Sequence, residues 1–320
     1  WNGRAQGDEV AGILNLVASD KYFEYLGPTA DQAHASPFIN PVEQGQPDTT
    51  AVCEHVKSAK YAPLYDIAYG EAIDCGEVGV VTTFARFALA LAAYQHSSEV
   101  NAFDSKRDRA LASDDTNPPA FPLTDFTDQE NLGHDLFYGK AGCGAFCHSS
   151  VNDGGTTLEE RYTNDGYFNI GVPRNVEIPG NPEPNIGLQA TTGNDELHLG
   201  LHKAPTLRNV DKRRGEGFKK AYMHNGWFKS LESVVHFYNT RDIKPPCEPG
   251  ATEKDALAQN CWPAPEVVEN LFGGPFIGDL GLTAEEEAAI VAYMKTFTDI
   301  STAKAPKPFN LKKFEKGELR

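Results

Sequence analysis

Hydrophobic positions along this chain repeat mostly at the three- and four-residue spacing of amphipathic helices, and alternating runs typical of strands are few. The stretch 78–94 is apolar on nearly every face, which predicts a buried helix. Ser230 is a favourable N-cap, so another helix should begin there. One face of that helix, at spacings i, i+3, i+4 and i+7, consists of Leu231, Val234, Val235 and Tyr238. These patterns predict a mainly α-helical fold.

Helix starts and loop composition organise the rest of the chain. Capping boxes at 127–130 and 283–286 predict two further helices, each followed by an apolar face. A short helix is expected over 9–18, and the Asp- and Pro-rich run 114–119 reads as a linker between two lobes. Residues 149–205 hold many Gly, Pro and Asn with little periodicity, which predicts long irregular loops around something other than a protein core.

Length and charge narrow the function classes. The 320 residues (34.9 kDa) suffice for one large domain or two ordinary ones. A net charge of -16 repels phosphate backbones and anionic lipids, which argues against a nucleic-acid partner. The longest apolar run, 87–94, is too short to span a bilayer, so we do not expect an integral membrane protein. The chain begins at Trp1 with neither Met nor signal peptide, so we expect that it was processed or belongs to a longer protein.

The six cysteines fall into pairs that are local in sequence: Cys53 with Cys75, Cys143 with Cys147, and Cys247 with Cys261. Disulfides in the first and last pairs would close loops of about 20 and about 15 residues, each worth roughly 3 kcal/mol. The alternative is four free, buried thiols. The middle pair is different because a histidine adjoins it, and an oxidising compartment implied by that motif favours the disulfides.

The strongest chemical signal is Cys143-Gly144-Ala145-Phe146-Cys147-His148. C-type haem is attached at C-x-x-C-H, where two thiols add to the porphyrin vinyl groups and the histidine binds iron. Here the spacer has three residues, and Gly144 and Ala145 are small enough to allow a bulge. A zinc site would need further Cys or His ligands at paired spacing, and a redox disulfide would not need the histidine. The motif therefore predicts a covalent haem c held by Cys143, Cys147 and His148.

The surroundings of this motif resemble the bacterial dihaem cytochrome c peroxidase and MauG family. Seven segments match in family order and span nearly the whole chain: 1–5 (W-N-G-R-A), 40–43 (N-P-V-E), 136–143, 203–210 (K-A-P-T-L-R-N-V), 221–226 (A-Y-M-H-N-G), 230–235 and 281–283. The resemblance implies c-type cytochrome-like helical lobes with irregular loops around haem. Insertions occur between Ala5 and Gln32 and around 213–220.

In the family, a haem on an N-terminal C-x-x-C-H precedes the segment that begins here at Trp1. The resemblance thus implies that residues 1–115 are the remainder of an N-terminal peroxidatic lobe with its helical connection. Residues 116–320 would be the C-terminal cytochrome c-like haem domain. A second haem is expected in the native protein, on a preceding part or a separate chain. The reason is that the residues described below as matching the family's inter-haem Trp and its distal acid, Trp1 and Glu43, would otherwise have no second iron to act on.

The resemblance also assigns the sixth ligand of the C-terminal haem. Typical peroxidases of the family have Met at this position and MauG-like members have Tyr, and the aligned residue here is Tyr238. The only methionines, Met223 and Met294, do not align. Without the family, a Tyr on an apolar helical face would be a core residue. A phenolate ligand stabilises ferric and higher-valent iron, which suits a centre that stores oxidising equivalents.

Further roles follow from the same resemblance. Glu43 matches the acid/base residue over the first haem, the alternative being a solvated loop residue. Pro37 keeps its family distance from Glu43, and Gln32, one residue off, matches the same distal pocket. Trp1 matches the Trp between the two haems, although a frayed terminus is the ordinary reading.

Two weaker assignments concern the haem surroundings. Arg208 is expected to pair with a haem propionate, because a guanidinium binds carboxylates in bidentate fashion. His224 is expected near the haem interface, with a structural role as the alternative.

Two further metal sites are conceivable. His198 and His202, four residues apart, could share a helix face and hold a second metal. The family often binds Ca²⁺ between its lobes, largely through backbone carbonyls and water.

The sequence thus predicts a periplasmic haem peroxidase-type oxidoreductase that uses hydrogen peroxide. Tyr238 favours a MauG-like enzyme that oxidises side chains of a partner protein. One alternative is a cytochrome c peroxidase that takes electrons from a small cytochrome. Another is a non-enzymatic electron carrier with one haem, for which a distal acid would have no use.

Overall fold

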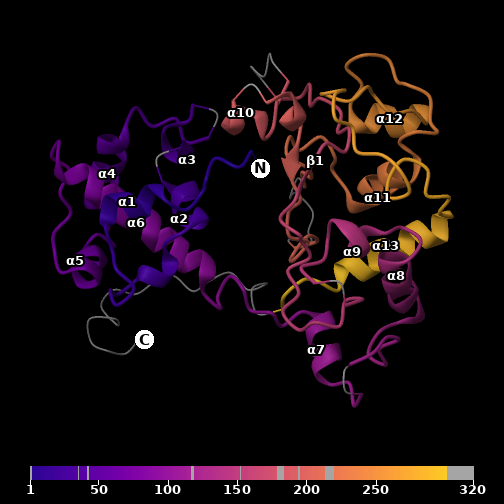
Figure 1. The fold of residues 1–320 in the computed structure, drawn as a ribbon, viewed down its shortest axis with the longest axis horizontal. Coiled ribbons are helices and arrows are strands. Elements are labelled where there is room, and N and C mark those ends of the chain that lie inside the picture. Colours follow the sequence, from indigo (N-terminus) through magenta and orange to yellow (C-terminus); the bar gives the residue numbers. More distant parts are fainter. Residues whose placement is uncertain are drawn as a thin grey trace. The chain divides into compact units, whose positions relative to one another are not determined.

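A computed structural model describes residues 2–34, 36–41, 43–116, 119–151, 153–178, 184–193, 195–212 and 220–300 (Figure 1). Within this part the chain forms two compact units, one of residues 4–101 and one of residues 102–300 joined by residues 2–3. The boundary precedes the predicted linker, so the segment 102–113 packs with the second unit. The roles assigned to 1–115 and 116–320 stay predictions.

The first unit is built around one long helix. Its elements are α1 (Glu9–Leu14), η1 (Phe23–Tyr25), α2 (Pro28–Ala33), α3 (Ser36–Ile39), α4 (Thr49–Lys57), α5 (Pro63–Tyr69) and α6 (Gly79–His96). Ala85, Ala88 and Ala92 of α6 are buried, and their small side chains allow α1 and α2 to pack closely against it. The predicted helix over 78–94 is present as α6. It is not buried on every face, because Val81 and Tyr94 are half-exposed.

Two local features of this unit are fixed by polar groups. The expected helix over 9–18 ends at Leu14, where Asn15 adopts a left-handed conformation (φ 48°). The buried carboxylate of Asp31 accepts hydrogen bonds from the backbone N–H groups of Gly7, Glu9 and Val10 (2.6, 3.2 and 3.0 Å). Burial raises the pKa of Asp31, but these bonds outweigh it and leave the pKa below its ordinary value. Asp31 thereby fixes α2 against the start of α1.

The second unit is also mainly helical. Its elements are α7 (Lys106–Ala112), α8 (Asp128–Tyr138), α9 (Cys143–Phe146), β1 (Tyr167–Phe168), α10 (Gln189–Thr192), η2 (Glu196–His198), β2 (His202–Lys203), α11 (Leu231–Thr240), α12 (Glu253–Gln259) and α13 (Ala284–Lys295). The strands β1 and β2 pair antiparallel, with Tyr167 opposite Lys203. Few strands occur in the described residues, which confirms the predicted mainly α fold class.

The predicted helix starts are confirmed at three places. Thr127 and Thr283 form complete capping boxes with the carboxylates of Glu130 and Glu286, and the Ser230 side chain caps α11. α8 and α13 cross closely at Gly133, where a Cβ atom would lie within 2.8 Å of the Tyr293 Cβ. This helix pair is the frame on which the rest of the unit is placed.

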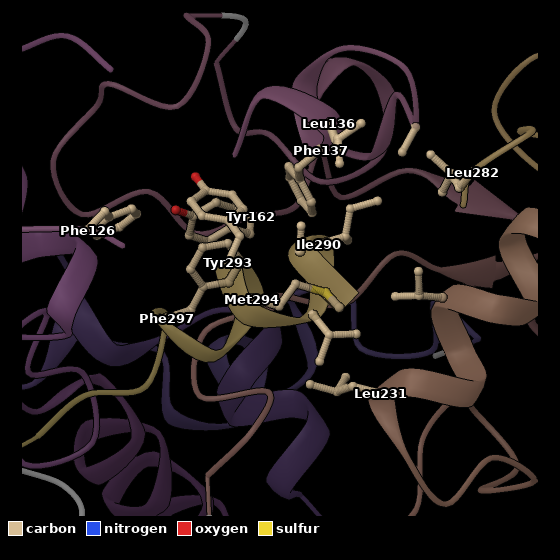
Figure 2. Packing of buried hydrophobic residues seen from close by; sticks show 14 of the residues in the cluster. Phe126, Leu136, Phe137, Tyr162, Leu231, Leu282, Ile290, Tyr293, Met294 and Phe297 are labelled. Carbon is tan, nitrogen blue, oxygen red and sulfur yellow. The ribbon is translucent and has the colours of Figure 1, made fainter. Parts of the chain in front are cut away.

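The core of the second unit lies around α8 and α13 (Figure 2). The rings of Tyr162 and Phe297 stack at a centroid distance of 3.9 Å, and Tyr293 meets Phe297 edge-on at 4.8 Å. On the other side of the same core lie Ile290 and Met294 of α13, which also border a pocket described below. The aromatic side of the core therefore supports the wall of that pocket.

The outer cysteines are paired in the structure. Cys53 is joined to Cys75 and Cys247 to Cys261, with S–S distances of 2.03 and 1.97 Å. The first bond ties α4 to the chain entering α6, and the second ties the segment after α11 to the end of α12. No helix in the described ranges has the length and apolar character needed to cross a lipid bilayer.

Candidate haem-binding site

The Cys-x-x-x-Cys-His motif folds into a helical turn. α9 spans Cys143–Phe146, and the backbone N–H groups of Cys147 and His148 both bond to the carbonyl of Cys143, the latter at 2.9 Å. Cys143 and Cys147 are at positions i and i+4, which share a helix face just as the i and i+3 cysteines of the usual motif do. Both thiols therefore line one pocket. A Cβ at residue 144 would lie 2.6 Å from Cδ1 and closer still to Cε1 of Tyr138, and 2.7 Å from Cε1 of Phe137. Gly144 is therefore needed because the turn packs directly on α8.

The pocket beside this turn is mainly apolar. The empty space within it and at its open mouth amounts to about 1160 Å³. Its apolar walls come from α8, α11, α13 and the intervening loops, and include Phe137, Leu231, Val234, Val235, Leu282, Ile290 and Met294. A flat, largely apolar macrocycle suits such walls. Cys143, Cys147, His148 and Tyr238 all line it.

His148 is set up as a metal ligand. Its Nδ1 donates a hydrogen bond to the backbone carbonyl of Tyr162 (3.0 Å), so Nε2 carries the lone pair. Burial lowers the pKa of His148 more than its bonds to the carbonyls of Tyr162 and Pro205 raise it, which favours the neutral imidazole that binds iron. The histidine therefore fits the role predicted from the sequence.

Tyr162 holds this carbonyl in place through an unusual backbone conformation. Its φ of 55° lies in the left-handed region, which is costly for a bulky residue. The buried carboxylate of Glu160 accepts from its N–H (2.8 Å), and its ring is stacked on Phe297. The conformation is thus fixed from two sides. No sequence signal pointed to Tyr162, because a backbone carbonyl carries no residue-type pattern.

The chemistry of the two thiols favours haem over the alternatives. Burial is the main cause that raises the pKa of both Cys143 and Cys147 to about 12, so they are neutral in the free pocket. A redox-active cysteine needs a lowered thiol pKa, whereas a zinc ion would itself lower the pKa of a thiol that binds it. In the part of the chain that the structure describes, no cluster of three His, Cys, Asp or Glu side chains could hold a metal ion. Neutral thiols in an apolar pocket suit thioether formation.

Tyr238 extends into the same pocket from α11, and burial raises its pKa well above the ordinary value. Phenolate formation there would need the compensating charge of a ferric ion. Met223 and Met294, which do not align with the family ligand position, also line the pocket. The structure thus brings Tyr238 together with the haem motif, and it leaves its role as iron ligand a prediction.

The residues predicted for a first haem lie in the first unit. Gln32 is an exposed residue of α2, Pro37 belongs to α3, and Glu43 is an exposed residue in the turn that follows α3. The N–H of Gln44 bonds to the carbonyl of Pro37 (3.3 Å), which folds the Glu43 turn back onto α3. Trp1 lies outside the described residues. The structure places the three described residues on neighbouring elements and leaves their catalytic roles predictions.

Arg208 has a partner within the protein, and its pairing with a haem propionate stays a prediction. Its guanidinium bonds to Asp108 (2.7 Å) at the start of α7, lies 4.4 Å from the centroid of the Phe103 ring, and is not among the residues that line the pocket. A buried arginine facing a buried aspartate is already compensated. The sequence missed this because Asp108 is distant along the chain and carries no motif.

His224 lies in the wall of the pocket that Cys143 and His148 also line, and its place near haem stays a prediction. Its Nε2 bonds to Glu266 (3.1 Å), and its ring stacks on that of His202 at 3.5 Å. The predicted face shared by His198 and His202 does not form: His198 ends η2 and bonds to Thr192, whereas His202 lies in β2. The role of His202 as a partner of His224 had no signal in the sequence.

The helical fold and a pocket lined by Cys143, Cys147 and His148 define a c-type haem protein. Residues 1–116 match the family model described as "Di-haem cytochrome c peroxidase". The methylamine utilization protein MauG of Paracoccus denitrificans is 32% identical over 276 residues, which cover 84% of this chain and 65% of MauG. The cytochrome-c peroxidase IdrP2 of Denitromonas iodatirespirans is 33% identical over 128 residues, 35% of this chain and 32% of that protein. The chain belongs to the di-haem cytochrome c peroxidase and MauG family.

The fold agrees with this assignment. The crystal structure of the diheme peroxidase BthA from Burkholderia thailandensis superposes with a TM-score of 0.63 at 23% identity, covering 86% of this chain and 64% of BthA. At that identity the likeness shows the fold alone. The chain spans just under two thirds of the length of MauG and of BthA.

Proposed function

We propose that this chain is the main part of a periplasmic c-type haem oxidoreductase that uses hydrogen peroxide and, like MauG, oxidises side chains of a partner protein. The observation that carries the proposal is the apolar pocket in which both thiols, His148 and Tyr238 meet. Haem bound there would supply one-electron redox chemistry and store oxidising equivalents.

The chain's own residues divide the work at this pocket. Cys143 and Cys147 hold the macrocycle covalently, and His148 provides the neutral nitrogen ligand, oriented by the Tyr162 carbonyl. Tyr238 provides an anionic oxygen ligand, which lowers the potential of the centre. The apolar wall excludes water and keeps the local dielectric low.

The choice between a MauG-like enzyme and a cytochrome c peroxidase rests on Tyr238. A low-potential centre suits a store of oxidising equivalents and is poorly suited to accept electrons from a high-potential cytochrome. Met223 and Met294 in the same pocket support the peroxidase alternative, because a thioether ligand raises the potential. The non-enzymatic carrier remains the third candidate if peroxide has no effect on the haem.

The peroxide step is assigned to the first unit. Glu43 would move a proton between the two oxygens of peroxide. Pro37, whose carbonyl accepts from the N–H of Gln44, and Gln32 of α2 would belong to the same distal pocket. The peroxide step requires a second haem with an open ligand position, because His148 and Tyr238 would both bind the iron of the haem held by Cys143 and Cys147. Ca²⁺ and a small-cytochrome or protein partner are carried over from the family as part of the proposal.

The compartment is proposed from the cysteines. C-type haem attachment and two disulfides both belong to an oxidising environment, and the structure pairs the four cysteines outside the haem motif. A periplasmic location satisfies both. The acidic surface adds no preference for membrane or nucleic acid.

Three measurements on natively purified protein test the proposal. The denatured chain should keep a haem mass and pyridine haemochrome bands, whereas haem extracted by acidified solvent would refute covalent attachment. Peroxide should alter the haem spectrum, and reduced small cytochrome c should be oxidised slowly if the enzyme is MauG-like and rapidly if it is a peroxidase. Glu43→Gln should slow the peroxide reaction by roughly 10²–10⁴-fold. The matched control Glu54→Gln, an exposed residue of α4, should react like the wild type.

A further inference from the structure

Two histidines and a glutamate form a buried polar group in the wall of the haem pocket. The rings of His202 and His224 are nearly parallel (9°) at a centroid distance of 3.5 Å. His224 bonds through Nε2 to Glu266, and both side chains are almost fully buried. Glu266 also accepts from the side chain of Asn225 (3.2 Å) and from the backbone N–H of Asn185 (3.1 Å). The glutamate and the second histidine are therefore satisfied within the protein.

His202 is the member of this group with an unused atom. Its Nδ1 lies 2.9 Å from the carbonyl of Gly200, so Nδ1 carries hydrogen and Nε2 carries the lone pair in the neutral ring. Nε2 is buried and has no hydrogen-bond partner, and the residue lines the pocket. A buried polar atom without a partner costs about 1–3 kcal/mol, which favours a ligand group at that position.

The chemistry of haem limits which group this can be. Apart from the iron, the polar groups of the macrocycle are its two carboxyl groups. We propose, on the basis of the function proposed above, that His202 binds a carboxyl group of the haem through Nε2, with one proton shared between the two. His224 and Glu266 act as positioning residues that hold the His202 ring by stacking and by their hydrogen bond.

The surrounding charges agree with a shared proton. Burial and the adjoining His224 ring lower the pKa of His202 to about 3, against the opposing effects of the Gly200 carbonyl and Glu266, so the ring is neutral in the free pocket. A carboxylate at Nε2 would favour proton uptake. The neighbouring Lys203, which also lines the pocket, pairs with Asp165. His202 presents a buried nitrogen without a partner to the carboxyl group.

The test uses infrared difference spectra of the haem-loaded full chain, reduced minus oxidised. The carboxyl carbons of haem are labelled with ¹³C through labelled 5-aminolevulinate, so that isotope-sensitive bands report the haem carboxyl groups alone. His202→Phe keeps a flat ring for the stack but removes Nε2. His202→Gln keeps a hydrogen-bonding group, and His198→Phe, outside the pocket, is the matched control.

The proposal predicts that His202→Phe shifts an isotope-sensitive carboxyl band that His198→Phe leaves in place. It also predicts a shift of the ferric–ferrous equilibrium toward ferric by about tenfold, or 59 mV for one electron, because an uncompensated carboxylate stabilises Fe³⁺. His202→Gln should recover part of both effects. A second haem would contribute equally to all variants.

Other outcomes have distinct meanings. Identical carboxyl bands in wild type and His202→Phe, with haem still attached, would overturn the proposal and leave the proposed function intact. A changed low-spin EPR signal with unchanged carboxyl bands would identify His202 as an iron ligand and would also overturn it. Absence of covalent haem in the wild type would refute the proposed function itself. If His202→Phe does not fold, the comparison of His202→Gln with wild type decides by the same bands.

Discussion

The crossing of α8 and α13 gives the sharpest prediction about the stability of the haem unit. A Cβ at Gly133 would lie 2.7 Å from the carbonyl carbon of Ala289 and 2.8 Å from the Tyr293 Cβ, and closer still to the Ala289 oxygen. These atoms belong to the backbone and the first side-chain carbon of α13, so they cannot rotate away. Gly133→Ala should therefore force the helices apart, although alanine improves helix propensity by about 1 kcal/mol.

The magnitude follows from the two opposing effects. Overpacking in a close-packed core costs typically 1–3 kcal/mol, and a rigid backbone contact puts this site at about 3 kcal/mol. After the gain in propensity, Gly133→Ala should lower the free energy of unfolding by about 2 kcal/mol, roughly thirtyfold in the equilibrium constant. Because α13 carries Ile290 and Met294 into the pocket, the variant should also bind haem less well.

Urea unfolding followed by circular dichroism provides the measurement, and Gly12→Ala provides the control. Gly12 lies inside α1 with open space where a Cβ would be, so alanine should stabilise its unit by up to about 1 kcal/mol. Transitions of the two units are to be fitted separately if they do not coincide. A Gly133→Ala protein as stable as the wild type would refute the close crossing of α8 and α13.

Three further predictions concern the site and its supports. Tyr238→Phe should give a high-spin EPR signal, whereas Tyr222→Phe, which also removes a hydroxyl from the pocket lining, should leave the low-spin signal; an unchanged signal in Tyr238→Phe would point to Met223 or Met294. Burial raises the pKa of Asp108, but Arg208, Ser105 and Arg107 lower it by more, so the native pKa lies below its ordinary value. The ionised carboxylate therefore stabilises the fold above about pH 4, and this stabilisation is lost as the pH falls through the native pKa. Asp108→Asn should lose about 3–5 kcal/mol at pH 7 and show a weaker acid dependence in unfolding titrations. Replacing Cys247 and Cys261 by Ser should cost about 3 kcal/mol in thermal unfolding, and no cost under non-reducing conditions would mean that this bond is absent.

The sequence predicted those parts of the fold that local chemistry decides. Capping residues at Thr127, Ser230 and Thr283 placed three helix starts, because an N-cap satisfies backbone N–H groups within one turn. The fold class and the family followed from helical periodicity and from motifs in a fixed order. The end of α1 was missed, because Asn15 in the left-handed conformation stops a helix that periodicity alone would extend.

The contacts that complete the site were beyond a reading of the sequence. The fold brings Asp108 to Arg208 across 100 residues, and no local pattern signals this contact. The Tyr162 carbonyl and the ring of His202 likewise lie in the stretch 149–205, which lacks periodicity, and the ring of His202 stacks on that of His224 from a later segment. Irregular loops are fixed by long-range packing, so their contacts follow from the fold and not from local patterns.

The three-residue spacer between the cysteines is one residue longer than the usual one, yet its geometry is compatible with haem attachment. Haem attachment requires two thiols on one face of the chain with the histidine directly after the second, and α9 meets this requirement with a full helical turn. The extra residue constrains the other face of the turn, where residue 144 must be glycine because a Cβ atom would clash with the rings of Tyr138 and Phe137. Phe146, the residue before the second thiol, points away and stacks on Phe276 at 5.2 Å. The spacing of the cysteines can therefore grow by one as long as the residue that faces α8 stays a glycine, which makes Gly144 as much a part of the motif as the residues that bind haem.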